Sequence, residues 1–276
     1  MSTQPVEQTQ ILMQSRTWSD YVWYSTEWNQ TNAVISPDLV INTQLANAFV
    51  VYLDGRRVGS RETHPHGEGA VTLSIPLPTL LPGDHQLTLL SESLGYGNAI
   101  GVWGASTQAK TKGITGDVYL HSKLSGTNQS LIHIEHEWCT CAGLTTCLNS
   151  TEAALGDEKD AAVFRSVWRF PTPLLNGDEQ LFVNVRKGRG HMKLNGVDLG
   201  RYWNITRRQS GKYSQPNYFL PPDYLLPDGR ENELVLENVL GGPNDNLHFV
   251  ATNIVPGSVL DVRGMEDEVD FPLSCF

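Results

Sequence analysis

The chain repeats one hairpin pattern in its two halves. "AFVVYLDGRRVGS" (48–60) and "GHMKLNGVDLGRYW" (190–203) each contain an alternating strand, a two-residue turn and a second short strand. The turns are Asp-Gly at 54–55 and Asn-Gly at 195–196. These dipeptides favour a type I′ turn, because both central residues of that turn need a positive φ. The sequence therefore predicts an equivalent β-hairpin in each half.

The match between the halves continues on both sides of the hairpin. "IPLPTLLPGDHQLTLLSESLG" (75–95) parallels "FLPPDYLLPDGRENELVLENVLGG" (219–242), with Leu-Leu-Pro before a long alternating strand in both. The offset is 195 − 54 = 141 at the hairpin and 227 − 82 = 145 at the proline. Upstream, an aromatic strand at 20–28 corresponds to one at 162–173. A nearly constant offset across separated features predicts an internal duplication.

Short alternating runs, separated by Gly, Pro, Asn and Asp, favour antiparallel strands, and few segments have a helical period. The sequence predicts an all-β protein of two tandem jelly-roll β-sandwich domains. A short helix is expected within 149–161, where Ser150 or Thr151 would cap it. The predicted segments are an N-terminal arm at 1–15, domain 1 at 16–125, domain 2 at 126–264 and a C-terminal tail at 265–276.

The charge and hydropathy of the sequence argue against nucleic-acid binding and against a transmembrane helix. Lys and Arg number 20 against 30 Asp and Glu, so the formal net charge is 20 − 30 = −10. An acidic surface repels phosphate backbones, which argues against nucleic acid as a partner. No stretch approaches the roughly 18 apolar residues of a transmembrane helix. "MSTQPVEQTQ" lacks a secretory pattern, which favours an intracellular location, and this polar arm would need a contact to be ordered.

Histidine, glutamate and cysteine gather in "HIEHEWCTCAGLTTC" (133–147). Zinc sites usually pair their ligands as C-x₂₋₄-C or H-x₃₋₅-H, and C-x-C-x₅-C fits neither spacing. Free thiols are favoured over a disulfide or a zinc site for Cys139, Cys141 and Cys147, and Cys275 stands apart from them. His64 and His66 are expected to be loop residues. The sequence predicts no metal site and no cofactor.

Catalysis by this chain alone is not expected. Retaining glycoside hydrolysis needs two carboxylates about 5–5.5 Å apart on either side of a sugar. Glu135 and Glu137 would share one strand face with no opposite wall, so they are interpreted as a solvated face. No nucleophile elbow, P-loop or dinucleotide fingerprint occurs in the sequence.

These segments resemble the C-terminal, non-catalytic part of plant-type family-35 β-galactosidases. The resemblance lies in "SDYVWYSTEW" (19–28), in the Leu-Leu-Ser to Val-Tyr-Leu stretch (89–120), in "GRGHMKLNGVDLGRYWNI" (188–205) and in the closing Pro-led segment (217–243). It covers about residues 16–255. The resemblance implies galactose-binding-domain-like jelly rolls, which in that family accompany a catalytic (β/α)₈ barrel. The barrel and its two glutamates have no counterpart here.

A sugar site on such modules would need an exposed aromatic face and convergent polar groups on loops at one end of the sandwich. The alternative for each aromatic residue is packing, because Trp23, Trp28 and Trp168 also fall in or beside predicted strands. The candidate carbohydrate-binding residues are Tyr96, Asn98 and Trp103 in the first half, and Arg201, Tyr202, Trp203 and Asn204 in the second.

The resulting hypothesis is a non-catalytic β-galactosidase-like protein that acts as a structural or interaction subunit with protein partners in a larger assembly. The apolar tail "DFPLSCF" (270–276) would dock on a partner or on the protein itself. The alternatives are a galactoside-binding module, and a C-terminal fragment of a β-galactosidase whose barrel lies on another segment.

Overall fold

The structure is a computed structural model of the chain. It divides into two compact units, Met1–Asp160 and Ala161–Phe276, and each is considered by itself. No helix among the described residues is long and apolar enough to cross a membrane. The structure describes residues 7–16, 19–63, 69–93, 111–122, 127–130, 138–145, 163–175, 178–185, 188–204, 217–227, 230–239 and 247–253.

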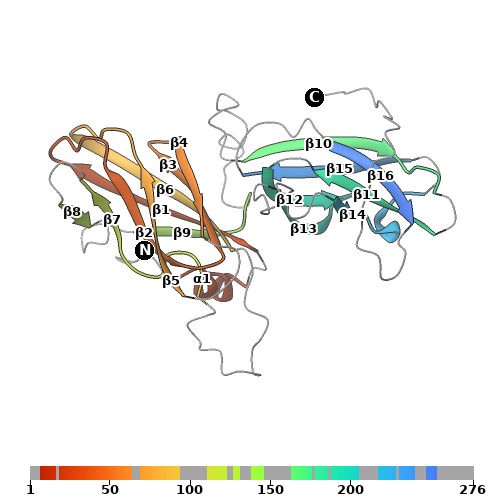
Figure 1. Cartoon of the computed structure of the whole chain (residues 1–276), viewed down its shortest axis with the longest axis horizontal. Helices are drawn as coiled ribbons and strands as arrows, with labels where there is room; N and C mark the ends of the chain where they lie inside the picture. Colours follow the sequence, from red (N-terminus) through yellow and green to blue (C-terminus); the bar gives the residue numbers. More distant parts are fainter. Residues whose placement is uncertain are drawn as a thin grey trace, which may run out of the picture. The chain divides into compact units, whose positions relative to one another are not determined.

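The first unit is a sandwich of two antiparallel sheets (Figure 1). One sheet has the strand order β4-β3-β6-β1-β9, and the other has the order β5-β2-β7-β8. The strands are β1 (Tyr21–Gln30), β2 (Asp38–Gln44), β3 (Asn47–Leu53), β4 (Arg56–Glu62), β5 (Ala70–Pro76), β6 (Gly83–Ser93), β7 (Val118–His121), β8 (Asn128–Ser130) and β9 (Trp138–Ala142).

Alternation along the strands builds the core of the first unit. On β1, Val22, Tyr24 and Trp28 point between the two sheets and join one cluster of buried side chains. Phe49 and Leu89 reach that cluster from β3 and β6. Because successive side chains of a strand point to opposite faces, the period-two pattern in the sequence is enough to direct these residues inward.

The second unit has a four-stranded sheet, β10-β15-β12-β13, and a three-stranded sheet, β14-β11-β16. Its core lies between them and includes Phe170, Val183, Met192, Tyr202 and Leu236. The strands are β10 (Phe164–Pro171), β11 (Glu179–Val185), β12 (Gly188–Leu194), β13 (Val197–Asn204), β14 (Asn217–Phe219), β15 (Glu231–Asn238) and β16 (Leu247–Asn253), with a 3₁₀ turn at Pro222–Tyr224.

The two units share one strand order. The strands β1 to β7 of the first unit correspond, in chain order, to β10 to β16 of the second. The order β4-β3-β6-β1 thus corresponds to β13-β12-β15-β10, and the order β5-β2-β7 corresponds to β14-β11-β16. The prediction of an all-β sandwich fold is therefore confirmed.

The two hairpins have the predicted turns. Asp54 and Gly55 have φ of 51° and 76°, and Asn195 and Gly196 have φ of 50° and 81°. Each hairpin also contains one register shift, three residues before the turn in the first strand, so that β4 and β13 each carry an extra residue there. The repeated dipeptides thus specify repeated backbone geometry.

The first unit extends beyond the boundary predicted at 125/126. Strand β8 pairs with β7, and β9 pairs with β1 through Thr26 opposite Trp138 and Val22 opposite Ala142. Trp138 is buried and meets the ring of Tyr24 edge-on, with ring centres 6.5 Å apart. The division between the units falls at 160/161 instead.

The predicted N-terminal arm contains a helix, α1 (Gln8–Ser15). Its first turn is capped by the Glu7 carboxylate, which accepts hydrogen bonds from the backbone N–H groups of Thr9 at 2.9 Å and Gln10 at 2.8 Å. Ile11 joins the core of the first unit. The helix expected within 149–161 and the tail 265–276 lie outside the described residues.

Candidate functional site

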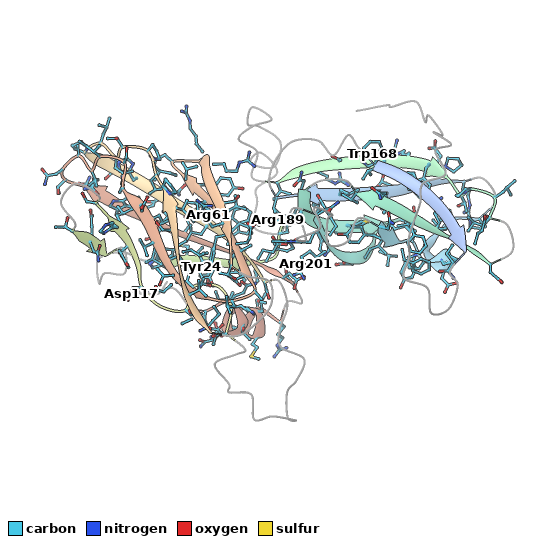
Figure 2. All side chains as sticks on the ribbon, viewed as in Figure 1. Tyr24, Arg61, Asp117, Trp168, Arg189 and Arg201 are labelled. Atoms are coloured by element: carbon cyan, nitrogen blue, oxygen red, sulfur yellow. The ribbon has the colours of Figure 1, made fainter. Side chains whose placement is uncertain are left out.

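The end of β13 holds the four candidate residues of the second unit, and they divide between two faces of the sheet. Tyr202 and Asn204 are fully buried. Arg201 and Trp203 are half-buried and alternate with them, so they point to the outer face of the sheet. Figure 2 labels Arg201 on β13 and Arg189 on the neighbouring β12. Only two of the four residues are therefore accessible to a ligand.

Tyr202 and Trp203 are fixed by Tyr218 on β14. The rings of Tyr202 and Tyr218 meet edge-on, with centres 6.4 Å apart. The Tyr218 hydroxyl accepts a hydrogen bond from the backbone N–H of Trp203 at 2.7 Å. Burial raises the pKa of Tyr218, although the Trp203 N–H and the charge of Arg201 act in the opposite direction. The phenol is thus a neutral packing group at physiological pH.

Arg189 covers the indole of Trp203. Its guanidinium carbon lies 5.0 Å from the ring centroid, and Arg189 and Trp203 are paired positions of β12 and β13. The arginine is fully buried. A cation at this distance from an aromatic face is attracted by the electrons of the ring, and burial strengthens the attraction. One face of Trp203 is therefore occupied by a residue of the chain itself.

Asn204 ends the strand with a buried carboxamide. Its Nδ2 donates to the carbonyl oxygen of Val185. Its Oδ1 finds no hydrogen-bond partner within the described part of the chain. The corresponding residue of the first unit is Thr63, whose hydroxyl accepts from the N–H of Asn47 at 2.9 Å. In both units, a buried polar residue lies at the end of the second hairpin strand, as the last residue of β13 or directly after β4.

The outer face of the same sheet carries paired charges. The Lys193 ammonium donates to Glu237 at 3.0 Å, and Glu237 is buried. His191 Nε2 lies 3.1 Å from the Asp198 carboxylate. Lys193 and His191 lie on the same face of the sheet as Trp203 and Arg201, because they alternate along β12 with inward residues such as Met192.

The corresponding end of the first unit holds a buried polar network that the sequence analysis did not identify. Gln8 is fully buried; its Nε2 donates to the carbonyl of Asp20 at 2.8 Å, and its Oε1 accepts from the Ser91 hydroxyl at 2.7 Å. Asn47 Nδ2 donates to Ser91 at 3.1 Å. The Lys112 ammonium donates to the carbonyl of Leu45 at 2.8 Å. The sequence indicated that the polar N-terminal segment needs a contact to be ordered, but it did not identify Gln8 or its partners.

Two tryptophans of the first unit, Trp23 and Trp28, pack in its interior, as the packing alternative expected. Trp23 and Trp28 are buried, and the Trp23 indole N–H donates to the carbonyl of Leu144 at 3.0 Å. Trp168 is half-buried against the second core. The candidates Tyr96, Asn98 and Trp103 lie outside the described residues, so their role stays a prediction.

The cysteine-rich segment is described in part. Cys141 is disulfide-bonded, and Cys139 is a free, exposed thiol. No group of three His, Cys, Asp or Glu side chains that could hold a metal ion occurs among the described residues. The other residues considered for a metal or a catalytic role, His64, His66, His133, Glu135, His136, Glu137, Cys147 and Cys275, lie outside them.

Comparison with known proteins finds similarity to plant β-galactosidases. β-Galactosidase 6 of Oryza sativa subsp. japonica is 27% identical over 274 residues, which cover 84% of this chain and 30% of the relative. β-Galactosidase 8 of Arabidopsis thaliana is 27% identical over 267 residues, with the same two coverages. The chain thus spans about 30% of the length of these relatives and resembles a C-terminal, non-catalytic part of them. No protein-family model matches the chain.

Among solved structures, the chain is similar to an α-L-rhamnosidase of Streptomyces avermitilis. The matched region covers 85% of this chain and 24% of the rhamnosidase chain, with 13% sequence identity and a TM-score of 0.27. The match to a lectin of Pleurotus ostreatus covers 86% of this chain and 76% of the lectin chain, with 12% sequence identity and a TM-score of 0.27. Structural similarity at these TM-scores does not indicate a function.

Proposed function

We propose that the chain is a non-catalytic, β-galactosidase-like protein whose two jelly-roll-like units serve as a structural or interaction subunit of a larger assembly. We propose further that the two units arose by internal duplication. Their shared strand order and the matching turn geometry of their hairpins support the duplication.

The internal use of the aromatic end of β13 carries the proposal. Tyr202 is part of the core, one face of Trp203 is covered by Arg189, and Asn204 is fully buried. A sugar-stacking platform needs a free aromatic face beside accessible polar groups. Side chains that are already committed to packing stabilise a rigid sandwich, and a rigid sandwich is suited to presenting a surface to a partner.

The extent of the resemblance also favours a part that works with other parts. The relatives are about three times as long as the matched portion, which covers 30% of their length. A chain of this kind is expected to work beside a catalytic portion, or beside partners that replace it. The C-terminal fragment alternative is compatible with the same coverage.

A galactoside-binding module is the second candidate. The outward side chains of Arg201 and Trp203 are only half-buried, and a cation beside an indole is suitable for contacting sugar hydroxyls and a sugar face. Tyr96, Asn98 and Trp103 would supply the corresponding site of the first unit in this alternative.

Titration calorimetry of the full chain with galactose and lactose distinguishes the two functions. If the chain is an interaction subunit, titration with millimolar sugar should give no saturable heat. Cross-linking should then identify a protein partner, and the two purified proteins should form a stoichiometric complex when mixed. Micromolar binding that is lost in Arg201→Ala, but retained in the surface control Arg169→Ala, would establish the galactoside-binding function instead. Arg169 is an exposed residue of β10, the strand at the opposite edge of the same sheet.

A further inference from the structure

The two hairpin turns are attached to the next strand by the same pair of hydrogen bonds. In the first unit, the Asp54 N–H donates to the carbonyl of Gln86 at 2.9 Å, and the Gln86 N–H donates to Asp54 Oδ1 at 2.8 Å. In the second unit, Asn195 and Glu233 form the same two bonds, both at 2.8 Å. The turn residue therefore has the same structural role in both units.

A third residue joins each turn to the Leu-Leu-Pro segment. His85 precedes Gln86; its Nδ1 lies 2.8 Å from Asp54 Oδ2, and its Nε2 lies 2.8 Å from the carbonyl of Leu81. We call the group of Asp54, His85 and Leu81 the first turn clamp. It fixes the β3–β4 turn to the connection between β5 and β6.

The second turn clamp consists of Asn195, Asn232 and Leu226. Asn232 precedes Glu233, and its Oδ1 accepts from Asn195 Nδ2 at 2.9 Å and from the Leu226 N–H at 2.7 Å. The strand partners also correspond, because His85 is opposite Trp28 on β1 and Asn232 is opposite Phe170 on β10. One geometry is therefore built from an Asp–His pair in the first unit and from an Asn–Asn pair in the second.

The two clamps differ in their need for a proton. An ionised carboxylate and a backbone carbonyl can only accept hydrogen bonds, so both ring nitrogens of His85 must donate. Only the imidazolium form can donate twice. The carboxamides of Asn195 and Asn232 do not titrate, and each supplies a donor and an acceptor at any pH.

The surroundings of His85 favour its charged form. The facing charged groups are the carboxylates of Asp54, on the β3–β4 turn, and of Asp84, the preceding residue of β6. From β1, the neutral indole of Trp28 packs on the ring, with centroids 5.4 Å apart. Glu27, also on β1, is bonded to Gln86 Nε2 at 3.0 Å.

We propose that the first turn clamp is a pH-sensitive device, closed while His85 carries both ring protons and opened when it loses one, whereas the second turn clamp stays closed throughout. Opening releases the carbonyl of Leu81, a residue that is 64% exposed. The surface that Leu81 forms at this end of the first unit is thereby ordered by a proton, and the equivalent end of the second unit is not.

The shift of the His85 pKa agrees with this geometry. Burial of the ring lowers the pKa of His85, but the hydrogen bonds to Leu81 and Asp54 and the charges of Asp54 and Asp84 outweigh it, so the pKa is raised above the ordinary value. A raised pKa in the folded state means that the clamp's contribution to stability is complete below the ordinary histidine pKa and is lost as the pH rises through the raised value.

Amide hydrogen exchange of the full chain tests the proposal, with rates corrected for the intrinsic effect of pH. Between about pH 5.5 and about pH 8.5, protection of the Asp54 and Gln86 amides should fall about tenfold, the loss expected for one charge-assisted hydrogen bond. Protection of the Asn195 and Glu233 amides should stay constant. Equal behaviour of the two pairs of amides, or a His85 ring that titrates at or below the ordinary value by NMR, would overturn the proposal.

Two variants complete the test. The double variant Asp54→Asn, His85→Asn copies the second clamp into the first unit and should remove the pH dependence at Gln86. His191→Asn is the matched control, because His191 also contacts a carboxylate but lies in the second unit; it should leave the response of Gln86 unchanged. If the double variant does not fold, the proposal is still tested by comparing the pH dependence of amide exchange at the two turn clamps of the unaltered chain.

Discussion

Arg189 and Trp203 occupy directly paired positions of β12 and β13, with the guanidinium carbon 5.0 Å from the centre of the indole ring. The sequence motif Gly-Arg-Tyr-Trp draws attention to Arg201 as the cation beside the aromatics. The cation that covers the indole comes instead from the preceding strand, and it is fully buried. This contact covers one face of the indole from within the chain, and it leads to the first prediction.

Replacing Trp203 with leucine should lower the free energy of unfolding of the second unit by about 1–3 kcal/mol, through lost packing and lost cation–π attraction. Urea denaturation followed by tryptophan fluorescence measures the change. Arg201→Leu, at the neighbouring outward position, should change stability by less than about 0.5 kcal/mol. A Trp203 variant of unchanged stability would contradict the packing role.

Gly190→Ala should destabilise the second unit strongly, by about 3 kcal/mol or more. A Cβ at this position would overlap the backbone carbonyl of Glu237 on β15, which cannot move away as a flexible side chain could. Gly196→Ala is the control: it meets no atom within 4 Å, but its φ of 81° should still make alanine about 1 kcal/mol less favourable. Thermal unfolding of both variants should preserve this order.

Gln8→Ala should destabilise the first unit by about 1–3 kcal/mol, because the buried Ser91 O–H loses its acceptor and the Asp20 carbonyl loses one of its donors. Gln10→Ala provides the comparison, since the Gln10 side chain is exposed two residues along the same helix. Equal unfolding midpoints for the two variants would mean that α1 is not an integral part of the unit.

Cys139 should react with N-ethylmaleimide in the native, unreduced chain, because it is a free and exposed thiol. Cys141 should react only after reduction, since it is disulfide-bonded. Peptide mapping by mass spectrometry distinguishes the two cysteines. Labelling of Cys141 without a reductant is the result that would refute this assignment.

The Tyr218 phenol should ionise at a higher pH than an ordinary tyrosine, because burial raises its pKa more than the Trp203 N–H and Arg201 lower it. The neutral form is favoured by folding, so the stability of the second unit should be constant up to the ordinary tyrosine pKa and should decline above it. Alkaline ultraviolet titration, with Tyr218→Phe to identify the signal, measures this. Ionisation at the ordinary value would argue against a buried phenol.

The hairpins could be predicted from the sequence because their determinants are local. Asp-Gly and Asn-Gly select the turn by themselves, and the alternation of the flanking residues directs side chains such as Phe49 and Met192 inward. The pairing of β9 with β1 is not local. No property of "WCTCA" reveals that Trp138 lies opposite Thr26, more than one hundred residues earlier.

The polar contacts were harder to predict for a related reason. His85 and Asn232 are different residue types, so aligning the two halves gives no sign that they occupy equivalent positions. Gln8 and Arg189 are buried against the general tendency of polar residues to remain exposed, because tertiary partners satisfy or cover them. Such burial depends on residues that are brought together only by the complete fold.

The position of β1 between β6 and β9 has a consequence for biosynthesis. Its partners β6 and β9 end at Ser93 and Ala142, so a ribosome must deliver well over one hundred residues before this sheet is complete. At elongation rates of about 5–20 residues per second, α1 and β1 wait for several seconds before their last neighbours emerge. Until β9 emerges, the edge of β1 that pairs with it has no hydrogen-bonding partner strand, and such an open edge can pair with another chain.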